Sequence, residues 1–130
     1  MSLSNLPEGV SLGVSPLSWT NDVLEDLGHD IPLETCLAQA AATGFQGVEL
    51  GRKFPRTAGT LGPLLSGHGL RLASGWHSGF LAERPVDDEI AAVRDHATLL
   101  SALGAKVMVY GPCGKMYPDA PLDVPLARRV

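Results

Sequence analysis

The sequence predicts an α/β protein built on a parallel β-sheet, and three observations lead to that prediction. Short apolar runs alternate with longer stretches in which apolar residues recur at helical spacing. These runs begin at residues 12, 46, 71 and 105, so their starts are 34, 25 and 34 residues apart, which suits a repeated strand and crossover helix. Two helix-to-strand junctions pass through a single glycine, as in (β/α) barrels and doubly wound sheets. The four predicted strands are Leu12–Leu17, Gln46–Leu50, Arg71–Trp76 and Ala105–Tyr110.

We expect these strands to pair in sequence order, 1-2-3-4, with right-handed crossovers. The first crossover helix is predicted over Pro32–Thr43, since a proline suits the first turn and Gly44 supplies the stop. The second, Thr57–His68, keeps a stripe of leucines although Pro63 lies within it. If that helix begins at Thr60, the proline falls in the first turn and costs little.

The third helix is predicted over Val86–Leu103 and ends at Gly104. Three acidic residues lie near the positive end of its dipole. Its inward face is expected to carry Ile90, Val93, Ala97 and Leu100. The segment 112–130 is rich in proline, has no sustained period and is predicted to be a loop or a disordered tail, so residues 1–111 form the predicted structured part.

The composition describes an ordinary globular chain. It has 130 residues, 45% of them hydrophobic and 18% charged, with a formal net charge of −4. With no basic run apart from the terminal Arg128-Arg129, no nucleic-acid partner is expected. No apolar run approaches a membrane span and the start has no signal-peptide pattern, so we expect a cytoplasmic protein that does not enter a membrane. Cys36 and Cys113 lack CxxC spacing and imply no disulfide framework.

Four segments of the chain resemble the inosose dehydratase family, a member of the xylose-isomerase-like (β/α)8 TIM-barrel superfamily. The resemblance runs in order from Leu12 to about Leu126, and its WTND and GRKFP motifs are the most specific part. The segments are Gly13–Asp22, Gly44–Pro55, Leu72–Ser78 and Leu103–Gly111. The resemblance implies a hydro-lyase of inositol catabolism that dehydrates 2-keto-myo-inositol by abstraction of an α-proton, formation of a metal-stabilised enediolate and loss of the β-hydroxyl as water.

The chain departs from this family in length, because an eight-unit barrel needs about 250 residues. Four βα units make half a barrel, here the N-terminal half. The resemblance implies a divalent metal, manganese or cobalt, whose ligands belong to the other half, and no metal ligand is assigned here because the four histidines are scattered. We expect the chain to be inactive alone, and either to form a homo-oligomer or to lack its C-terminal half.

Two charged residues of the GRKFP region are candidate catalytic groups. Glu49 ends an apolar strand, where its carboxylate can accept hydrogen bonds from substrate hydroxyls or orient a cation. A structural pairing of Glu49 with Arg52 or Lys53 is the alternative. Lys53 can polarise a ketone or stabilise a developing enolate, or it is simply an exposed loop lysine.

The WTND motif supplies three candidate substrate-binding residues. Trp19, Thr20 and Asn21 combine an apolar face with short hydrogen-bonding groups, which suits a cyclic polyol ketone. Asn21 can equally cap the turn that follows the strand.

Three further candidates come from the last two strands. His77 is a candidate acid or base because it ends a strand, and a histidine at a strand end in a cleft can serve in that role near neutral pH. Trp76 and Tyr110 are candidate substrate contacts, although Tyr110 also suits a core tyrosine with its hydroxyl at the rim. We expect all the candidate residues to cluster at the carboxyl edge of the sheet.

Two other functions remain open. A sugar isomerase or epimerase of the same superfamily uses the same enediolate but returns the proton. A non-catalytic half-barrel would self-associate through open strand edges and through the inner face of its sheet. Candidates for that inner face are Val14, Val48, Ala73 and Val107.

Overall fold

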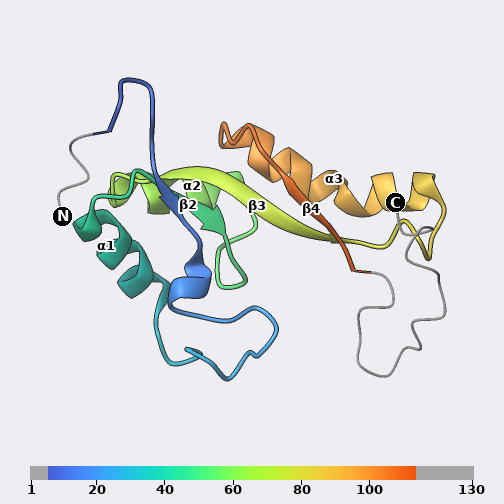
Figure 1. Cartoon of the computed structure of the whole chain (residues 1–130), viewed down its shortest axis with the longest axis horizontal. Helices are drawn as coiled ribbons and strands as arrows, with labels where there is room; N and C mark the ends of the chain where they lie inside the picture. Colours follow the sequence, from blue (N-terminus) through green and yellow to red (C-terminus); the bar gives the residue numbers. More distant parts are fainter. Residues whose placement is uncertain (1–5, 114–130) are drawn as a thin grey trace.

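Four parallel strands form one curled sheet in the order β1-β2-β3-β4 in the computed structural model, which describes residues 6–113 (Figure 1). The predicted parallel pairing and strand order are confirmed. Helices connect successive strands, so the described part of the chain is half of a (β/α) barrel. Its elements are β1 Gly13–Val14, the 3-10 turn η2 Pro16–Ser18, α1 Leu33–Thr43, β2 Gly47–Leu50, α2 Ala58–Gly67, β3 Arg71–Gly79, α3 Val86–Ala102 and β4 Val109–Pro112.

The two outer strands differ from the prediction. β1 contains two residues rather than six, because the chain turns into η2 at Pro16 and the Ser15 side chain caps that turn by accepting a hydrogen bond from the Leu17 N–H. β4 begins at Val109 instead of Ala105 and ends at Pro112, since its ladder with β3 begins opposite Trp76. The tail predicted for 112–130 lies outside the described residues, except for the first two positions.

The helices follow the prediction closely at their ends. Gly44 adopts φ 97° after α1, a left-handed conformation that glycine accepts without strain, and β2 begins three residues later. The short junction predicted after Gly104 is longer, because β4 starts only at Val109. Pro63 lies inside α2 rather than in its first turn, so the carbonyl of Gly59 lacks its helical partner.

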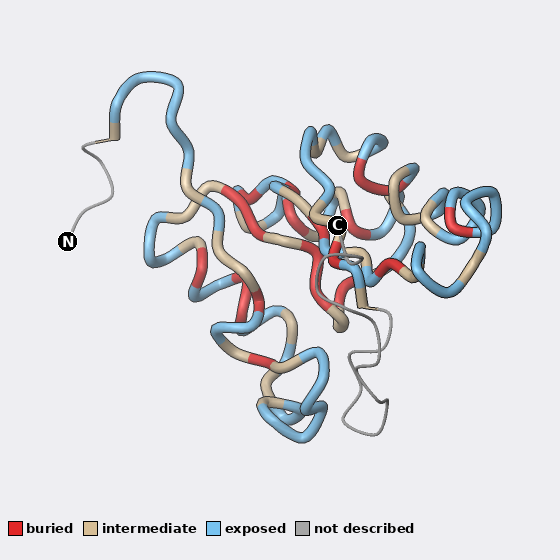
Figure 2. The backbone as a smooth tube through the Cα atoms, turned by 45° about the vertical axis from the view of Figure 1, so that its right-hand side comes forward, coloured by how far each residue is buried: buried red, intermediate tan, exposed pale blue. Residues whose placement is uncertain are grey.

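The core lies between the sheet and all three helices. Its buried side chains come from every helix and from β2 and β3 (Figure 2). Burial of this apolar surface is the main force that holds the helices on the sheet. The core members are Leu37, Ala40, Val48, Leu50, Phe54, Leu61, Leu65, Leu70, Leu72, Leu99 and Leu100.

This core fixes which face of the sheet is convex and which is concave. Val48 is buried in the core and Val14 packs against it, so the expectation that both line the inner face is wrong. The concave face instead carries small groups near β1, because Cβ atoms placed on Gly13 and Gly47 would lie 3.2 and 3.3 Å from the Cβ of Ala73. Ala73 lies on the expected face.

The inward face of α3 also differs from the prediction. Leu100 is buried as expected, but Ile90 is 51% exposed, and the buried residue in that turn is Glu89. The reason is rotational phase, since adjacent residues differ by about 100° around a helix. The sheet covers the side that carries Glu89 and Leu100 and leaves the neighbouring side open.

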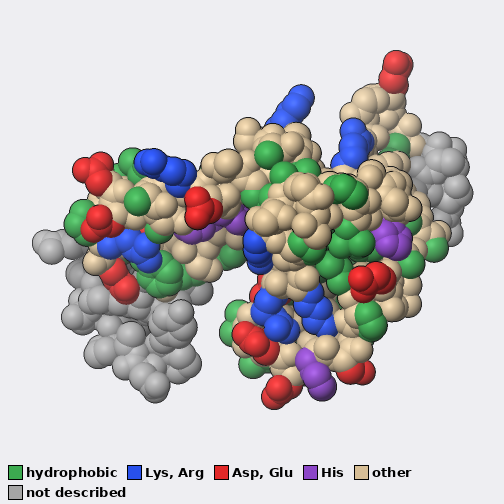
Figure 3. Space-filling view, turned by 180° about the vertical axis from the view of Figure 1, so that it is seen from behind, with side chains coloured by type: hydrophobic (Ala, Val, Ile, Leu, Met, Phe, Trp, Pro, Cys, Tyr) green, Lys and Arg blue, Asp and Glu red, His purple; other side chains and the backbone are tan. Residues whose placement is uncertain are grey.

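Acidic and basic side chains are interspersed on the face of the molecule that Figure 3 shows. Among the described residues, no helix combines the length and the apolar character needed to cross a membrane.

Candidate functional site

A β-bulge in β3 decides which candidate side chains face the concave side. Val48 pairs with Leu72, but Glu49 pairs with Ser74, so β3 contains one extra residue at Ala73. The extra residue reverses the alternation of side chains beyond it. Trp76 therefore faces the concave side, whereas strict alternation from the buried Leu72 would have placed it against the helices.

Glu49 lies on the concave face of β2. Its neighbours Val48 and Leu50 point into the core, so its own side chain points the other way. The Ser74 hydroxyl donates a hydrogen bond of 3.3 Å to Glu49 Oε1. Among the ion pairs of residues 6–113, Glu49 pairs with neither Arg52 nor Lys53, the two partners predicted as the structural alternative. Arg52 instead pairs with Glu25 at 3.4 Å.

Trp76 lies on the same concave face and covers Gly111 of the neighbouring strand. Its Nε1 donates a hydrogen bond of 3.0 Å to Ser78 Oγ. A Cβ atom on Gly111 would lie 1.9 Å from Trp76 Cζ2, so the indole occupies the space that any larger residue at 111 would need. The tryptophan is nevertheless 52% exposed. The concave face thus carries both an aromatic surface, Trp76 on β3, and a carboxylate, Glu49 on β2.

His77 and Tyr110 face the helix side. The two residues are paired in register, and their rings are 5.8 Å apart. Both approach the carboxylate of Glu89 from α3, with Tyr110 donating a 3.0 Å hydrogen bond to Oε1 and His77 Nε2 lying 3.4 Å from the same oxygen. The expected single cluster is therefore divided between the two faces of the sheet.

Glu89 is the centre of this helix-side cluster. It is only 3% exposed, and its Oε2 accepts from the Phe80 backbone N–H at 3.2 Å and pairs with Arg84 Nε at 3.1 Å. Burial alone would raise the pKa of Glu89, but the hydrogen bonds from Tyr110 and Phe80, with Arg84 and His77 nearby, hold it below the ordinary value.

The neighbouring groups respond to the same environment. Burial raises the pKa of Tyr110, and the hydrogen bond to Glu89 and the negative charge of Glu89 raise it further. Burial lowers the pKa of His96, whose ring lies 5.7 Å from that of His77, and the charges of His77 and Arg56 lower it further. These shifts favour a neutral tyrosine and neutral His96 around one ionised carboxylate.

The three residues of the WTND motif make local contacts. Trp19 Nε1 donates a 2.6 Å hydrogen bond to Gln39 Oε1 on α1, and Thr20 is buried with its hydroxyl 3.4 Å from the Pro16 carbonyl oxygen. Asn21 Oδ1 accepts hydrogen bonds from the backbone N–H groups of Val23 and Leu24. The turn-capping interpretation of Asn21 therefore describes its contacts.

Lys53 holds the long loop between β1 and α1. Its Nζ donates to the carbonyl oxygens of Gly28, His29 and Ile31 at 2.8, 3.0 and 2.6 Å. An ammonium group has three N–H donors, so these contacts use its full capacity. In this arrangement Lys53 shapes the loop rather than pointing an unpaired charge at the concave face.

The described residues do not fit a divalent metal. Within residues 6–113, no group of three His, Cys, Asp or Glu side chains is placed to hold an ion. Glu49 has a serine hydroxyl as its hydrogen-bond partner rather than a second carboxylate. Cys36 is buried in α1, and burial raises the pKa of its thiol, which suits packing rather than ligation.

Comparison with known proteins identifies the relatives of this chain. No protein-family model matches it. The rhizopine catabolism protein MocC of Rhizobium meliloti is 46% identical over 101 residues, which are 78% of this chain and 31% of the relative. Inosose dehydratase of Geobacillus thermodenitrificans is 41% identical over 105 residues, which are 81% of this chain and 35% of the relative. Inosose dehydratase 2 of Bacillus cereus is 37% identical over 117 residues, which are 90% of this chain and 39% of the relative.

The chain belongs to the inosose dehydratase family. It spans about a third of the length of the curated relatives it matches, consistent with an N-terminal part of the barrel. The half-barrel fold observed above agrees with that position in the family.

Within this family member, sequence reasoning missed Ser74, Ser78 and Glu89. The acidic run 87–89 was interpreted as a complement to the helix dipole. A signal for Glu89 was present, because it shares a helix face with His96 and Leu100, seven and eleven residues later. The two serines carry no signal until the bulge is known.

Proposed function

We propose that this chain supplies the N-terminal half of an inosose dehydratase barrel and that its concave face binds a cyclic polyol ketone. Its relatives carry the name inosose dehydratase, which supports a hydro-lyase acting on such a ketone. The observation that carries the proposal is the shared face of Glu49 and Trp76. A half-exposed indole on the same face as a carboxylate offers an apolar surface for the ring and an acceptor for its hydroxyl groups.

The reaction requires two bonds to break. A C–H bond α to the ketone gives up its proton, and the C–O bond of the β-hydroxyl breaks so that this oxygen leaves as water. Glu49 is the carboxylate on the concave face that can accept a hydrogen bond or a proton from a bound ring. The Ser74 hydroxyl orients it.

We assign the other candidate residues according to their contacts. Trp19, Thr20 and Asn21 shape the start of the β1–α1 loop, and Lys53 anchors its end. His77 and Tyr110 hold β3 and β4 against α3 through Glu89. These residues position the concave face, while Glu49 and Trp76 touch the substrate.

The remaining βα units complete the site. Within residues 6–113, β4 is the last strand of the sheet, so its outer edge is open there to further strands. We propose that the divalent metal implied by the family resemblance is held by those units, because residues 6–113 offer no ligand set. The residues described here therefore bind and orient substrate, and the chain alone is inactive.

The test is an activity assay on a completed barrel. The chain is co-expressed with the C-terminal remainder of the Geobacillus relative and supplied with manganese and 2-keto-myo-inositol. We expect a product that is lighter than the substrate by one water, and a large loss of turnover in Glu49→Gln. The matched control is Glu34→Gln, on the exposed surface of α1.

A product of unchanged mass would contradict dehydration and favour a sugar isomerase or epimerase. Equal activity in Glu49→Gln and Glu34→Gln would contradict the role of Glu49.

A further inference from the structure

Ser78 lies exposed on the concave face of β3, and only part of its hydrogen-bonding capacity is used. Trp76 Nε1 donates to Ser78 Oγ at 3.0 Å. An indole N–H can only donate, so Ser78 must be the acceptor in this contact. A hydroxyl group also has one O–H donor, and within residues 6–113 no side chain or carbonyl accepts that proton. Ser78 therefore presents a donor to a ligand that lies on the indole.

The other polar side chains on the concave face of β2, β3 and β4 offer no second free donor. Ser74 gives its proton to Glu49 Oε1, and Trp76 gives its N–H to Ser78. The carboxylate of Glu49 accepts hydrogen bonds. On these three strands the concave face thus combines one acceptor group, Glu49, with one unused donor, Ser78.

The donor and the acceptor lie on either side of the indole. Ser74, Trp76 and Ser78 follow one another at two-residue intervals, so their side chains form a row along one face of β3. Glu49 is bonded to the Ser74 end of this row. Four residues of extended strand separate Ser74 from Ser78, a distance of roughly 13 Å. The row therefore runs from an acceptor, across an aromatic surface, to a donor.

We propose that Ser78 determines specificity by donating a hydrogen bond to the ketone oxygen of a cyclic polyol ketone that lies on Trp76. A ketone oxygen accepts hydrogen bonds but cannot donate them, so it matches Ser78 and is repelled by the carboxylate of Glu49. The hydroxyl groups of the ring can donate, and they match Glu49. The inference rests on the proposed function for the placement of such a ketone on this face, and it adds the direction in which the ring lies.

The contact with the indole prepares Ser78 for this role. A hydroxyl group that accepts one hydrogen bond is polarised and becomes a stronger donor. The indole is itself held in place, because it occupies the space above Gly111 on β4. Ser78 is therefore oriented before a ligand arrives, and less conformational entropy is lost on binding.

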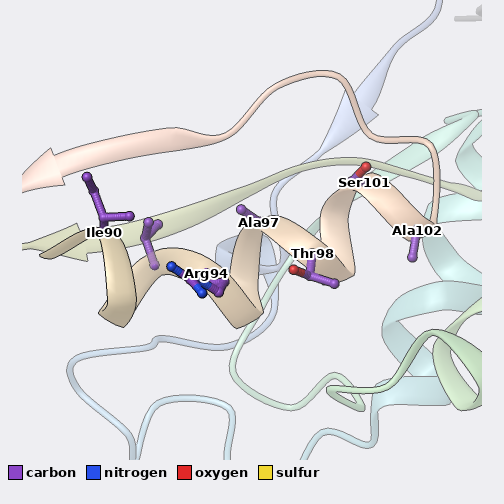
Figure 4. Close-up of a pocket in the computed structure, with 7 residues that line it drawn as sticks. Ile90, Arg94, Ala97, Thr98, Ser101 and Ala102 are labelled. Carbon is purple, nitrogen blue, oxygen red and sulfur yellow. The ribbon is translucent and has the colours of Figure 1, made fainter. Parts of the chain in front are cut away.

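The hollow along one side of α3 is a weaker candidate for binding a polyol (Figure 4). It lies on the other side of the sheet, since His77 and not Ser78 faces α3. All of its lining residues belong to this one helix, and Arg94 is the one charged side chain among them. A polyol needs several hydrogen-bonding groups that converge on it, whereas side chains of a single helix diverge from its axis.

The test compares two ligands that differ at one oxygen, 2-keto-myo-inositol and myo-inositol, in which a hydroxyl group replaces the ketone. The chain is assembled with the C-terminal remainder of the Geobacillus inosose dehydratase, and calorimetric titration without added metal gives both dissociation constants. Ser78→Asp keeps an acceptor for the indole but turns a second acceptor toward the ketone. Selectivity should shift toward myo-inositol at least about tenfold, because its hydroxyl group can donate to the new carboxylate and the ketone cannot.

Two control variants should keep the parent selectivity. Ser78→Thr retains the hydroxyl group at the same position. Ser66→Asp introduces the same charge on the exposed end of α2. Thermal unfolding of the isolated Ser78→Asp chain checks that it folds, and its midpoint should lie close to that of the parent because Ser78 is exposed.

Ser78→Ala separates a donor to the ligand from a residue that merely holds the indole. It removes both the donor and the acceptor, and it should weaken ketone binding about two- to tenfold. Equal weakening of both ligands by Ser78→Ala, with no effect of Ser78→Asp, would show that Ser78 acts through Trp76 alone and would overturn the inference. Saturable ketone binding with unchanged selectivity in Ser78→Asp would overturn it and leave the proposed function in place. A parent assembly that binds neither ligand would overturn the proposed function as well.

Discussion

Replacement of Gly111 by alanine tests the fixed position of Trp76 on the concave face. The new methyl group would lie 1.9 Å from Trp76 Cζ2 and 2.3 Å from Cη2, whereas nonbonded carbon atoms pack at about 3.5–4.0 Å. Either the indole or strand β4 must therefore move by more than about 1 Å. Overpacking of this kind costs about 1–3 kcal/mol, and movement of the indole also breaks its hydrogen bond to Ser78.

The assay uses a Trp19→Phe background, in which Trp76 is the sole tryptophan. Gly111→Ala should increase acrylamide quenching of the emission and lower the denaturant midpoint. The control is Gly59→Ala in α2, where a Cβ atom meets nothing within 4 Å, and alanine should stabilise that helix by up to about 1 kcal/mol. Identical quenching and stability in the two alanine variants would refute the proposed packing of Trp76 on Gly111.

The remaining predictions concern the helix-side cluster and the loop. The pKa of Glu89 is lowered in the folded state, so its contribution to stability should be complete above about pH 4.5 and should be lost as the pH falls through the folded pKa. When the free energy of unfolding is measured against pH, Glu89→Gln should flatten that part of the profile. Burial also lowers the pKa of His96, so the folded state should lose stability as the pH falls below about 6.5. His96→Leu should remove that loss of stability, whereas the control His29→Leu, on the exposed loop, should leave it in place. Lys53→Met should speed amide hydrogen exchange in residues 28–31, and unchanged exchange there would contradict the anchoring role.

The fold was predictable where local signals agree with one another. β2 and α1 were predicted almost residue for residue, because an apolar run follows a helix that ends at Gly44. β1 was overextended because its apolar residues resemble a strand while Pro16 and Ser15 form a turn. The start of β4 depends on where β3 provides partners, which is a tertiary property.

The candidate residues could be chosen from the sequence, but their division between the two faces of the sheet could not be predicted from it. Glu49 and Trp76 lie on the concave face of the sheet, whereas His77 faces α3 because of one extra residue at Ala73. A bulge of this kind has no reliable signature in a single sequence, yet it exchanges the two faces of everything that follows in the strand. The burial of Glu89 depends on the rotation of α3 against the sheet, which the acidic run did not indicate.

Titration of Trp76 emission with 2-keto-myo-inositol tests most directly whether the concave face is the substrate site. The measurement uses the Trp19→Phe chain assembled with the C-terminal remainder of a relative. We predict a saturable change in emission, with a midpoint that Glu49→Gln shifts to higher ketone concentration and Glu34→Gln leaves in place. The absence of a saturable change, or a midpoint that Glu49→Gln leaves unaltered, would contradict the proposed site.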